Sequence, residues 1–271
     1  MDNRAIAVFD SGLGGLTAVK RIADLMPNES IIYFGDTGRV PYGTRSEATI
    51  IKYVKQDINF LSAFNVKAVL AACGTASTVA LPKIELDNDV TVMGVFKPAC
   101  SAAVKATKNG RIAVIGTAGT IKSGAYEKEI LSLLPSAKVI SKACPLFVPI
   151  VENGHTSKDD IIAKTLVEEY MSEIKQFGAD TVILGCTHYP LLKEAIADFM
   201  GDAVLIDSGA QAAVAMGEFL KERDMLSDRE NNGELKLYVS DYSAGVFESL
   251  ASAFLEMELE NTIETIDIEK F

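Results

Sequence analysis

Cysteine, histidine and tryptophan are scarce in this sequence. It has four cysteines, two histidines and no tryptophan, and no two cysteines form a Cys-x-x-Cys pair. This pattern excludes a zinc site built on paired ligands and a disulfide framework, because both need closely spaced Cys or His residues. We therefore expect free thiols in a reducing compartment, no bound metal and a cytoplasmic location.

Positive charge and long apolar runs are also scarce. Lys and Arg total 26 against 37 Asp and Glu, so the formal net charge is -11. An acidic balance disfavours attachment to nucleic-acid phosphates or anionic lipid and favours a small-molecule partner. No apolar run is long enough to span a bilayer, and the short apolar stretch before Asp10 is not typical of a signal peptide. We expect no nucleic-acid or membrane partner.

Short apolar runs bounded by Gly, Asn, Asp or Pro alternate with helix-like stretches along the chain. This alternation predicts an α/β fold with largely parallel sheets. The predicted strands cover residues 5–9, 30–34, 68–72, 90–95, 112–115, 138–140, 181–184, 204–206 and 235–239. The predicted helices cover residues 15–25, 45–64, 124–134, 158–177, 190–199 and 211–223.

Two pairs of segments recur at similar offsets. Residues 6–9, Ile-Ala-Val-Phe, resemble residues 112–115, Ile-Ala-Val-Ile, and the apolar run that ends at Cys73 resembles the one that ends at Cys186. The recurrence indicates two related halves, with chance similarity among common Ile-Ala-Val strands as the alternative. If the halves are related, the site lies in the cleft between them and each half contributes one cysteine.

Cys73 and Cys186 each follow the carboxyl end of a predicted strand. Ligands of open α/β sheets bind just outside these ends, so both thiols are predicted to face a site. Cys100 and Cys144 lack such surroundings, and we interpret them as small buried residues. His188 follows Cys186 closely and could exchange protons with it, although a structural histidine fits the sequence equally well.

Three loops add candidate site residues. Residues 10–16, Asp-Ser-Gly-Leu-Gly-Gly-Leu, follow a strand and open a helix, so their backbone N–H groups predict an anion receptor. The spacing is not that of dinucleotide-binding loops, because Thr17 stands where the third glycine belongs. After the second strand, Tyr42 and the amide of Gly43 are predicted to line the same pocket. Glu152, beside Asn-Gly, is typical of a solvated turn.

Taken together, five segments resemble the motifs of the glutamate racemases in order and spacing over nearly the whole chain. The segments are residues 10–16, 36–43, 73–77, 144–149 and 185–192. The resemblance implies a cofactor-independent amino-acid racemase that acts on glutamate, supplies D-glutamate for peptidoglycan and forms a homodimer. It also implies two similar α/β domains, residues 1–96 plus 207–271 and residues 97–206, with the active site in the cleft between them.

The resemblance also assigns roles to residues. Cys73 and Cys186 become the two acid/base groups, with Asp10 supporting Cys73, and Glu152 and His188 supporting Cys186. The residues assigned to substrate binding are Asp10, Ser11, Tyr42, Gly43, Gly74, Thr75, Thr187 and His188, with Thr117 and Thr120 as weaker candidates. Inverting an α-carbon needs a base on one face and an acid on the other, and a thiol with pKa about 8.5 is easily tuned to either role.

One residue departs from the family pattern. The usual segment is Cys-Asn-Thr, whereas Gly74 follows Cys73 here. Either water or backbone replaces the missing amide, or the protein acts on another substrate or has lost activity. The alternatives are therefore a racemase of aspartate or another acidic amino acid and a binding protein for acidic ligands. A separate alternative is a Cys-His-Glu hydrolase with Cys186 as nucleophile, because thiol, imidazole and acid are the parts that it needs, but it leaves Cys73 without a role.

Overall fold

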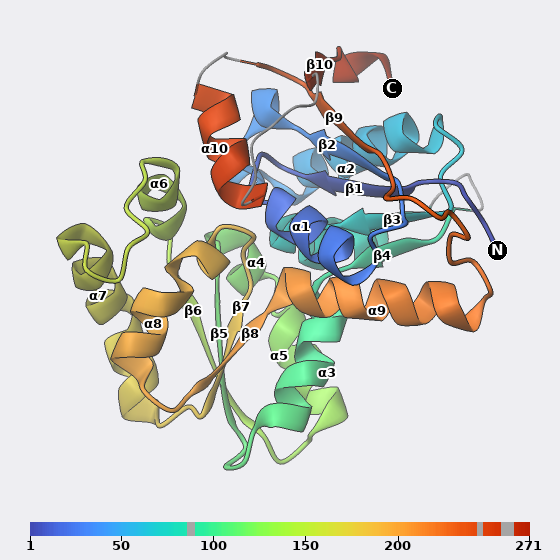
Figure 1. The fold of residues 1–271 in the computed structure, drawn as a ribbon. Helices are drawn as coiled ribbons and strands as arrows, with labels where there is room; N and C mark the ends of the chain where they lie inside the picture. The colour runs from blue at the N-terminus through green and yellow to red at the C-terminus, as the bar shows by residue number, and fades with distance from the viewer. Residues whose placement is uncertain (86–89, 243–245, 256–262) are drawn as a thin grey trace.

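Two parallel sheets with surrounding helices make up the fold (Figure 1). The computed structural model describes residues 1–85, 90–242, 246–255 and 263–271. The larger sheet has the strand order β10-β9-β2-β1-β3-β4, and the smaller has β6-β5-β7-β8. The strands are β1 Ile6–Asp10, β2 Ile31–Gly35, β3 Ala68–Ala71, β4 Val92–Gly94, β5 Arg111–Gly116, β6 Lys138–Ala143, β7 Thr181–Leu184, β8 Val204–Asp207, β9 Leu235–Val239 and β10 Ile263–Thr265.

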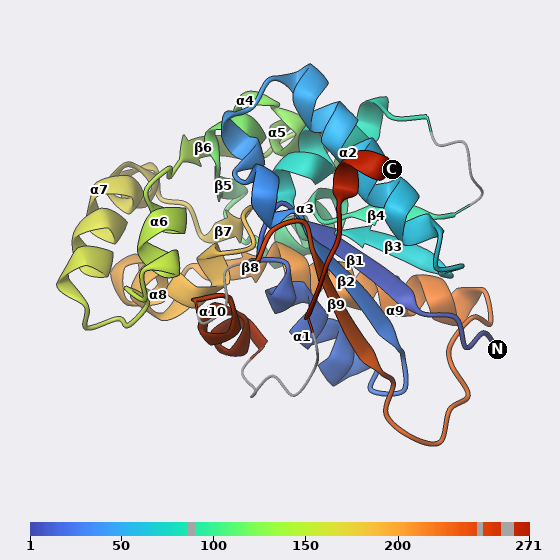
Figure 2. The same cartoon turned by 90° about the horizontal axis from the view of Figure 1, so that it is seen from above.

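The helices cover both sheets and lie between them. They are α1 Leu16–Leu25, α2 Glu47–Ser62, α3 Phe96–Ala106, α4 Ala118–Lys122, α5 Ala125–Leu133, α6 Phe147–Glu152, α7 Ile161–Phe177, α8 Lys193–Met200, α9 Ser208–Glu222 and α10 Val246–Leu255. Helix α9 packs against α1 and α3, so it joins the two halves of the molecule. Figure 2 shows α6, α7 and α8 beside the smaller sheet, away from the larger one.

Four strands of the larger sheet, β2-β1-β3-β4, have the same order and direction as the smaller sheet, β6-β5-β7-β8, which supports the internal repeat. Strand β1 pairs with β2 and β3, and β5 pairs with β6 and β7 in the same way. Strand β4 then pairs with β3, and β8 pairs with β7, so β4 and β8 form equivalent edges of the two sheets. Ile6 aligns with Ala68 in the first sheet as Ile112 aligns with Thr181 in the second. Cys73 and Cys186 therefore come two residues beyond the ends of equivalent strands.

The core is continuous across the two sheets. Its largest buried cluster includes Val8 of β1, Ile115 of β5 and Leu184 of β7. The proposed domain limits, 96/97 and 206/207, fall near the crossings between the sheets, after β4 and at the end of β8. Among the described residues, no helix is both long enough and apolar enough to cross a membrane.

Each predicted strand and helix is present, with ends shifted by a few residues, but five elements were not predicted. These are β10, α3, α4, α6 and α10. Two of them, α3 and α6, contain a proline, which normally argues against a helix. Pro98 in α3 and Pro149 in α6 both occupy the first helical turn, where a missing N–H costs no intrahelical bond. The helix predicted at 211–223 begins earlier, at Ser208, because the Asp207 side chain accepts a hydrogen bond from Ala210 N.

Candidate active site

Cys73 lies at the carboxyl end of β3 and is only 5% exposed. Its Sγ accepts from the backbone N of Ala76 and donates to Ser11 Oγ, both at 3.5 Å. Burial, followed by the charges of Asp10 and Cys186, raises the pKa of Cys73 to about 12. The Cys73 thiol therefore keeps its proton near neutral pH.

Cys186 lies at the equivalent end of β7 and faces a histidine. Its Sγ is 4.0 Å from His188 Nδ1, and His188 Nε2 is 3.0 Å from Glu152 Oε1, supplied by the last residue of α6. Burial opposes the charged imidazole, but the contacts with Cys186 and Glu152 prevail and raise the pKa of His188 to about 10. The His188 imidazole thus lies between Cys186 Sγ and the Glu152 carboxylate, and Thr187 Oγ1 is 3.4 Å from its Nδ1.

Asp10, at the end of β1, carries an unpartnered buried oxygen. Oδ2 accepts from Gly12 N at 3.1 Å, whereas Oδ1 has no hydrogen-bond partner among the described residues. Burial raises the pKa of Asp10, and the charge of His188 together with nearby backbone N–H groups opposes this rise. Because buried polar atoms are nearly always paired, Oδ1 is a candidate contact for a bound ligand.

Three threonine hydroxyls connect the loops of the two sheets. Thr75 Oγ1, after β3, is 2.9 Å from Thr117 Oγ1 and 3.3 Å from Thr120 Oγ1, both after β5. Thr117 donates to Thr120 at 3.1 Å. Gly43 lies against this cluster, since a Cβ on it would be 2.8 Å from Thr117 Oγ1. The structure thus places Thr75, Gly43 and both weaker threonine candidates together.

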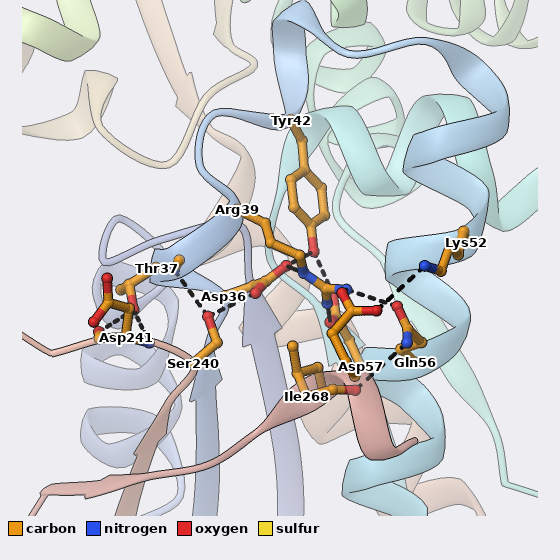
Figure 3. A network of polar contacts seen from close by, with 12 residues as sticks. Asp36, Thr37, Arg39, Tyr42, Lys52, Gln56, Asp57, Ser240, Asp241 and Ile268 are labelled. Carbon is orange, nitrogen blue, oxygen red and sulfur yellow. Dashed lines mark hydrogen bonds and ion pairs between the residues drawn. The ribbon is translucent and has the colours of Figure 1, made fainter.

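The Tyr42 side chain points towards Asp36, Arg39 and Asp57 (Figure 3). Its ring is fully buried, and its hydroxyl contacts Asp36 and lies 2.8 Å from Asp57 Oδ2. The Tyr42 hydroxyl therefore contacts buried carboxyls. Of the two neighbouring residues, Gly43 is the one that lies against Thr117.

Backbone atoms of another loop occupy the space that an asparagine side chain at residue 74 would need. A Cβ on Gly74 would be 2.2 Å from the carbonyl oxygen of Gly185, in the loop after β7. Gly14 lies as close to the same loop, because a Cβ added to Gly14 would be 2.3 Å from Thr187 Oγ1. The cavity left beside Gly74 and Cys186 measures about 10 Å³. A cavity of that size holds about one water molecule, so the two sets of loops must separate before an amino acid can enter.

Sequence reasoning missed the network around Asp57. Asp36 and Arg39 belong to a recognised motif, but Asp57 lies in α2, where a carboxylate is usually solvated. A signal was present, because Asp57 is in helical register with Val54 and Leu61 on the buried face. A charged residue within an apolar helical stripe indicates a buried polar contact.

Comparisons with known proteins identify relatives of this chain in sequence and in structure. Residues 17–217 match the family model described as Asp/Glu/Hydantoin racemase. The chain is 43% identical over 243 residues to a glutamate racemase of Geobacter metallireducens, covering 89% of each chain. It is 42% identical over 266 residues to one of Persephonella marina, covering 98% of each. The structure is similar, with a TM-score of 0.92, 38% identity and 100% coverage of both chains, to the glutamate racemase of Francisella tularensis in complex with D-glutamate.

Proposed function

Because this chain belongs to the Asp/Glu/hydantoin racemase family and is therefore an amino-acid racemase, we propose that it interconverts L- and D-glutamate using Cys73 and Cys186. The observation that carries the proposal is the position of the two thiols at equivalent strand ends of two equivalent sheets, close enough for the charge of one to act on the other. Its relatives at 42% and 43% identity bear the name glutamate racemase, which supports glutamate as the substrate.

The proposed chemistry uses the two sides of the cleft in opposite roles. In one direction, a thiolate at Cys186, favoured by the positive His188, takes the α-proton, and the Cys73 thiol delivers a proton to the opposite face. In the other direction, the roles of the cysteines exchange. Each turnover moves one proton to the protein and one from it, so the chemistry balances without any added group.

Substrate binding follows from the polar groups around the thiols. Asp10 Oδ1, which has no hydrogen-bond partner among the described residues, suits the substrate ammonium. The first N–H groups of α1, those of residues 16–18, already donate to the carbonyls of residues 13–15, so we assign the substrate carboxylates to the hydroxyls near the thiols. The hydroxyls of Ser11, Thr75 and Thr187 lie in the three loops that carry Asp10, Cys73 and Cys186, and they complete the proposed contacts. A dry, preorganised pocket of this kind stabilises the charge that develops when the α-proton leaves.

The wider proposal concerns the setting of the reaction. The protein works as a cytoplasmic homodimer, needs no cofactor, and supplies D-glutamate for peptidoglycan. The most direct support for cofactor independence is that the two thiols account for both proton transfers.

Serine substitutions test the two-base assignment. In Cys73→Ser and in Cys186→Ser, we expect racemisation in both directions to fall by about 10²- to 10⁴-fold, because a serine hydroxyl is a far weaker acid than a thiol. Circular dichroism follows the interconversion, and deuterium uptake at the α-carbon in heavy water follows proton exchange. Cys100→Ser, in α3 and away from the cleft, is the matched control.

Normal two-way turnover by either variant would overturn the assignment. Aspartate serves as the competing substrate, and faster racemisation of aspartate than of glutamate would favour the alternative specificity. Binding of glutamate without deuterium uptake would identify a binding protein instead.

A further inference from the structure

A buried network anchors the segment that carries Tyr42 and Gly43. Arg39 lies at its centre and donates from Nε to Asp36 Oδ2 at 2.6 Å, from Nη2 to Asp57 Oδ1 at 3.0 Å and from Nη1 to Gln56 Oε1 at 2.6 Å. Asp36 and Asp57 are both fully buried. Figure 3 shows the Tyr42 hydroxyl pointing into this group.

Among the described residues, the network holds two fully buried carboxyls and one largely buried cation, Arg39, whose side chain is 10% exposed. Lys52 and Glu269 also approach it, but both are more than half exposed. With Arg39 as the buried counter-charge, one carboxyl must stay neutral to avoid an uncompensated buried charge.

Hydrogen-bond counting identifies the neutral carboxyl. The Tyr42 hydroxyl contacts both acids but has one hydrogen, so it donates to one and accepts from the other. Both acids accept from Arg39, but Asp36 also accepts from Ser240 Oγ at 2.7 Å, so we assign Asp36 as the acceptor for Tyr42 as well. Asp57 is then the donor, in agreement with burial and Asp36, which raise its pKa well above the ordinary value.

The anchored segment is a wall of the active site. Gly43, the residue after Tyr42, lies against Thr117, and a Cβ on Gly119 would be 2.9 Å from the Gly43 carbonyl oxygen. Thr117 in turn contacts Thr75. Any movement of Tyr42 therefore displaces backbone that touches the threonine cluster.

We propose that Asp36, Arg39 and Asp57 are positioning residues for racemisation, with a proton held on Asp57, and that they act through Tyr42 to place Gly43 against the threonine cluster. Tyr42 is in this view an anchor whose hydroxyl does not touch the substrate. The inference rests on the proposed function, because its kinetic test measures glutamate turnover.

Two substitutions of Asp57 test the proposal. Asp57→Asn keeps the shape and supplies an N–H donor to Tyr42, so we expect a KM within about twofold of the parent. Asp57→Ala removes both contacts, and Tyr42→Phe removes the shared hydroxyl. For these two we expect KM to rise by about tenfold with a smaller change in kcat, because substrate contact is weakened more than proton transfer.

Lys67→Met is the matched control for simple destabilisation. Lys67 pairs with buried Glu29 at 2.5 Å, just before β3 and therefore at the opposite end of that strand from Cys73. Its loss leaves a buried carboxylate unpaired and should lower Tm, while KM stays unchanged.

Three results would overturn the proposal. The first is an unchanged KM in Asp57→Ala. The second is Asp57→Asn as impaired as Asp57→Ala, which would contradict the proton on Asp57. The third is a raised KM in Tyr42→Phe alone, which would place its hydroxyl at the substrate.

Hydrogen exchange separates this proposal from the proposed function. Peptides covering residues 37–45 should exchange faster in Asp57→Ala than in the parent, Asp57→Asn or Lys67→Met. This readout needs no turnover, so it stands even if the parent protein fails to racemise glutamate. Equal exchange in all four proteins would contradict the anchoring.

Discussion

His188 shows how two neighbours can reverse the effect of burial on one residue. Burial in an apolar site favours the neutral imidazole, but His188 lies between Cys186 and Glu152, and these contacts raise its pKa to about 10. The ring also packs in a T-shaped arrangement against Phe254 from α10, with the ring centroids 5.4 Å apart. A charged imidazole beside Cys186 is thus a property of the folded protein.

The raised pKa of His188 predicts a pH-dependent contribution to stability. Since the folded pKa is about 10 and the reference value is 6.5, the contribution is complete below pH 6.5 and is lost as pH rises towards 10. We expect His188→Gln to be less stable than the parent at pH 6, with a difference that shrinks steadily towards pH 10. Urea unfolding at a series of pH values measures this.

Glu152→Gln gives the control for that experiment. It removes one cause of the raised pKa, so the pH at which the contribution disappears should move lower. A stability difference between parent and His188→Gln that is constant from pH 6 to 10 would contradict the assignment.

At the scale of elements, α9 is the joint between the two sheets. It begins directly after β8 of the smaller sheet and packs on α1, which follows the first strand of the larger sheet. Asp207 stops the strand and caps the helix, since its Oδ1 accepts from Ala210 N at 3.0 Å. One side chain therefore fixes where the chain passes from strand to helix.

Loss of the cap should cost stability. We expect Asp207→Ala to lower the free energy of unfolding by about 1 kcal/mol, because the first helical turn loses its side-chain acceptor. Asp207→Asn retains an acceptor oxygen and should lie within about 0.5 kcal/mol of the parent. Urea unfolding at pH 7 compares the three proteins, and an equal loss in both variants would point to a role of the charge other than capping.

At the scale of the whole molecule, glycines allow the two sets of loops to meet. Gly74 and Gly14 face Gly185 and Thr187 at distances that no side chain would allow, and Gly43 meets Thr117 in the same way. The closed cleft leaves about 10 Å³ beside Cys186. A cavity of that size is too small for an amino acid, so these loops must separate before one can enter.

A methyl group at Gly74 should hold the cleft open. In Gly74→Ala, we expect faster alkylation of Cys73 and Cys186, which are 5% and 8% exposed, because the Gly185 carbonyl must move away. Mass spectrometry of iodoacetamide-treated peptides follows each cysteine separately. Cys100 and Cys144 are fully buried and should stay unreactive in every protein.

Gly217→Ala is the matched control for Gly74→Ala. Its added methyl group in α9 meets only the flexible end of Met26, at 3.3 Å. Alkylation rates of Cys73 and Cys186 that are the same in both variants would show that Gly74 does not govern closure.

The sequence alone was enough to predict the α/β fold, the strands that matter for the site and the equivalence of Cys73 and Cys186. These predictions succeed because parallel strands are buried apolar runs with clear ends, and because the repeat places each cysteine after the same strand. Short helices such as α6 were missed, since six residues containing a proline carry little periodicity. The family motifs, and not local pattern, pointed to Glu152 as a site residue.

Tertiary structure decided what surrounds those cysteines. Packing within the smaller half brings Glu152 of α6 onto His188, and packing of α2 on the larger sheet brings Asp57 to the Tyr42 hydroxyl. Contact between the loops of the two sheets sets the Gly185 carbonyl over Gly74. These contacts join residues far apart in the chain, and their charge states depend on burial and on neighbours that no local pattern contains. The sequence determined where the thiols lie along the strands, and the fold determined that Cys73 is buried beside Asp10 and that Cys186 lies beside His188.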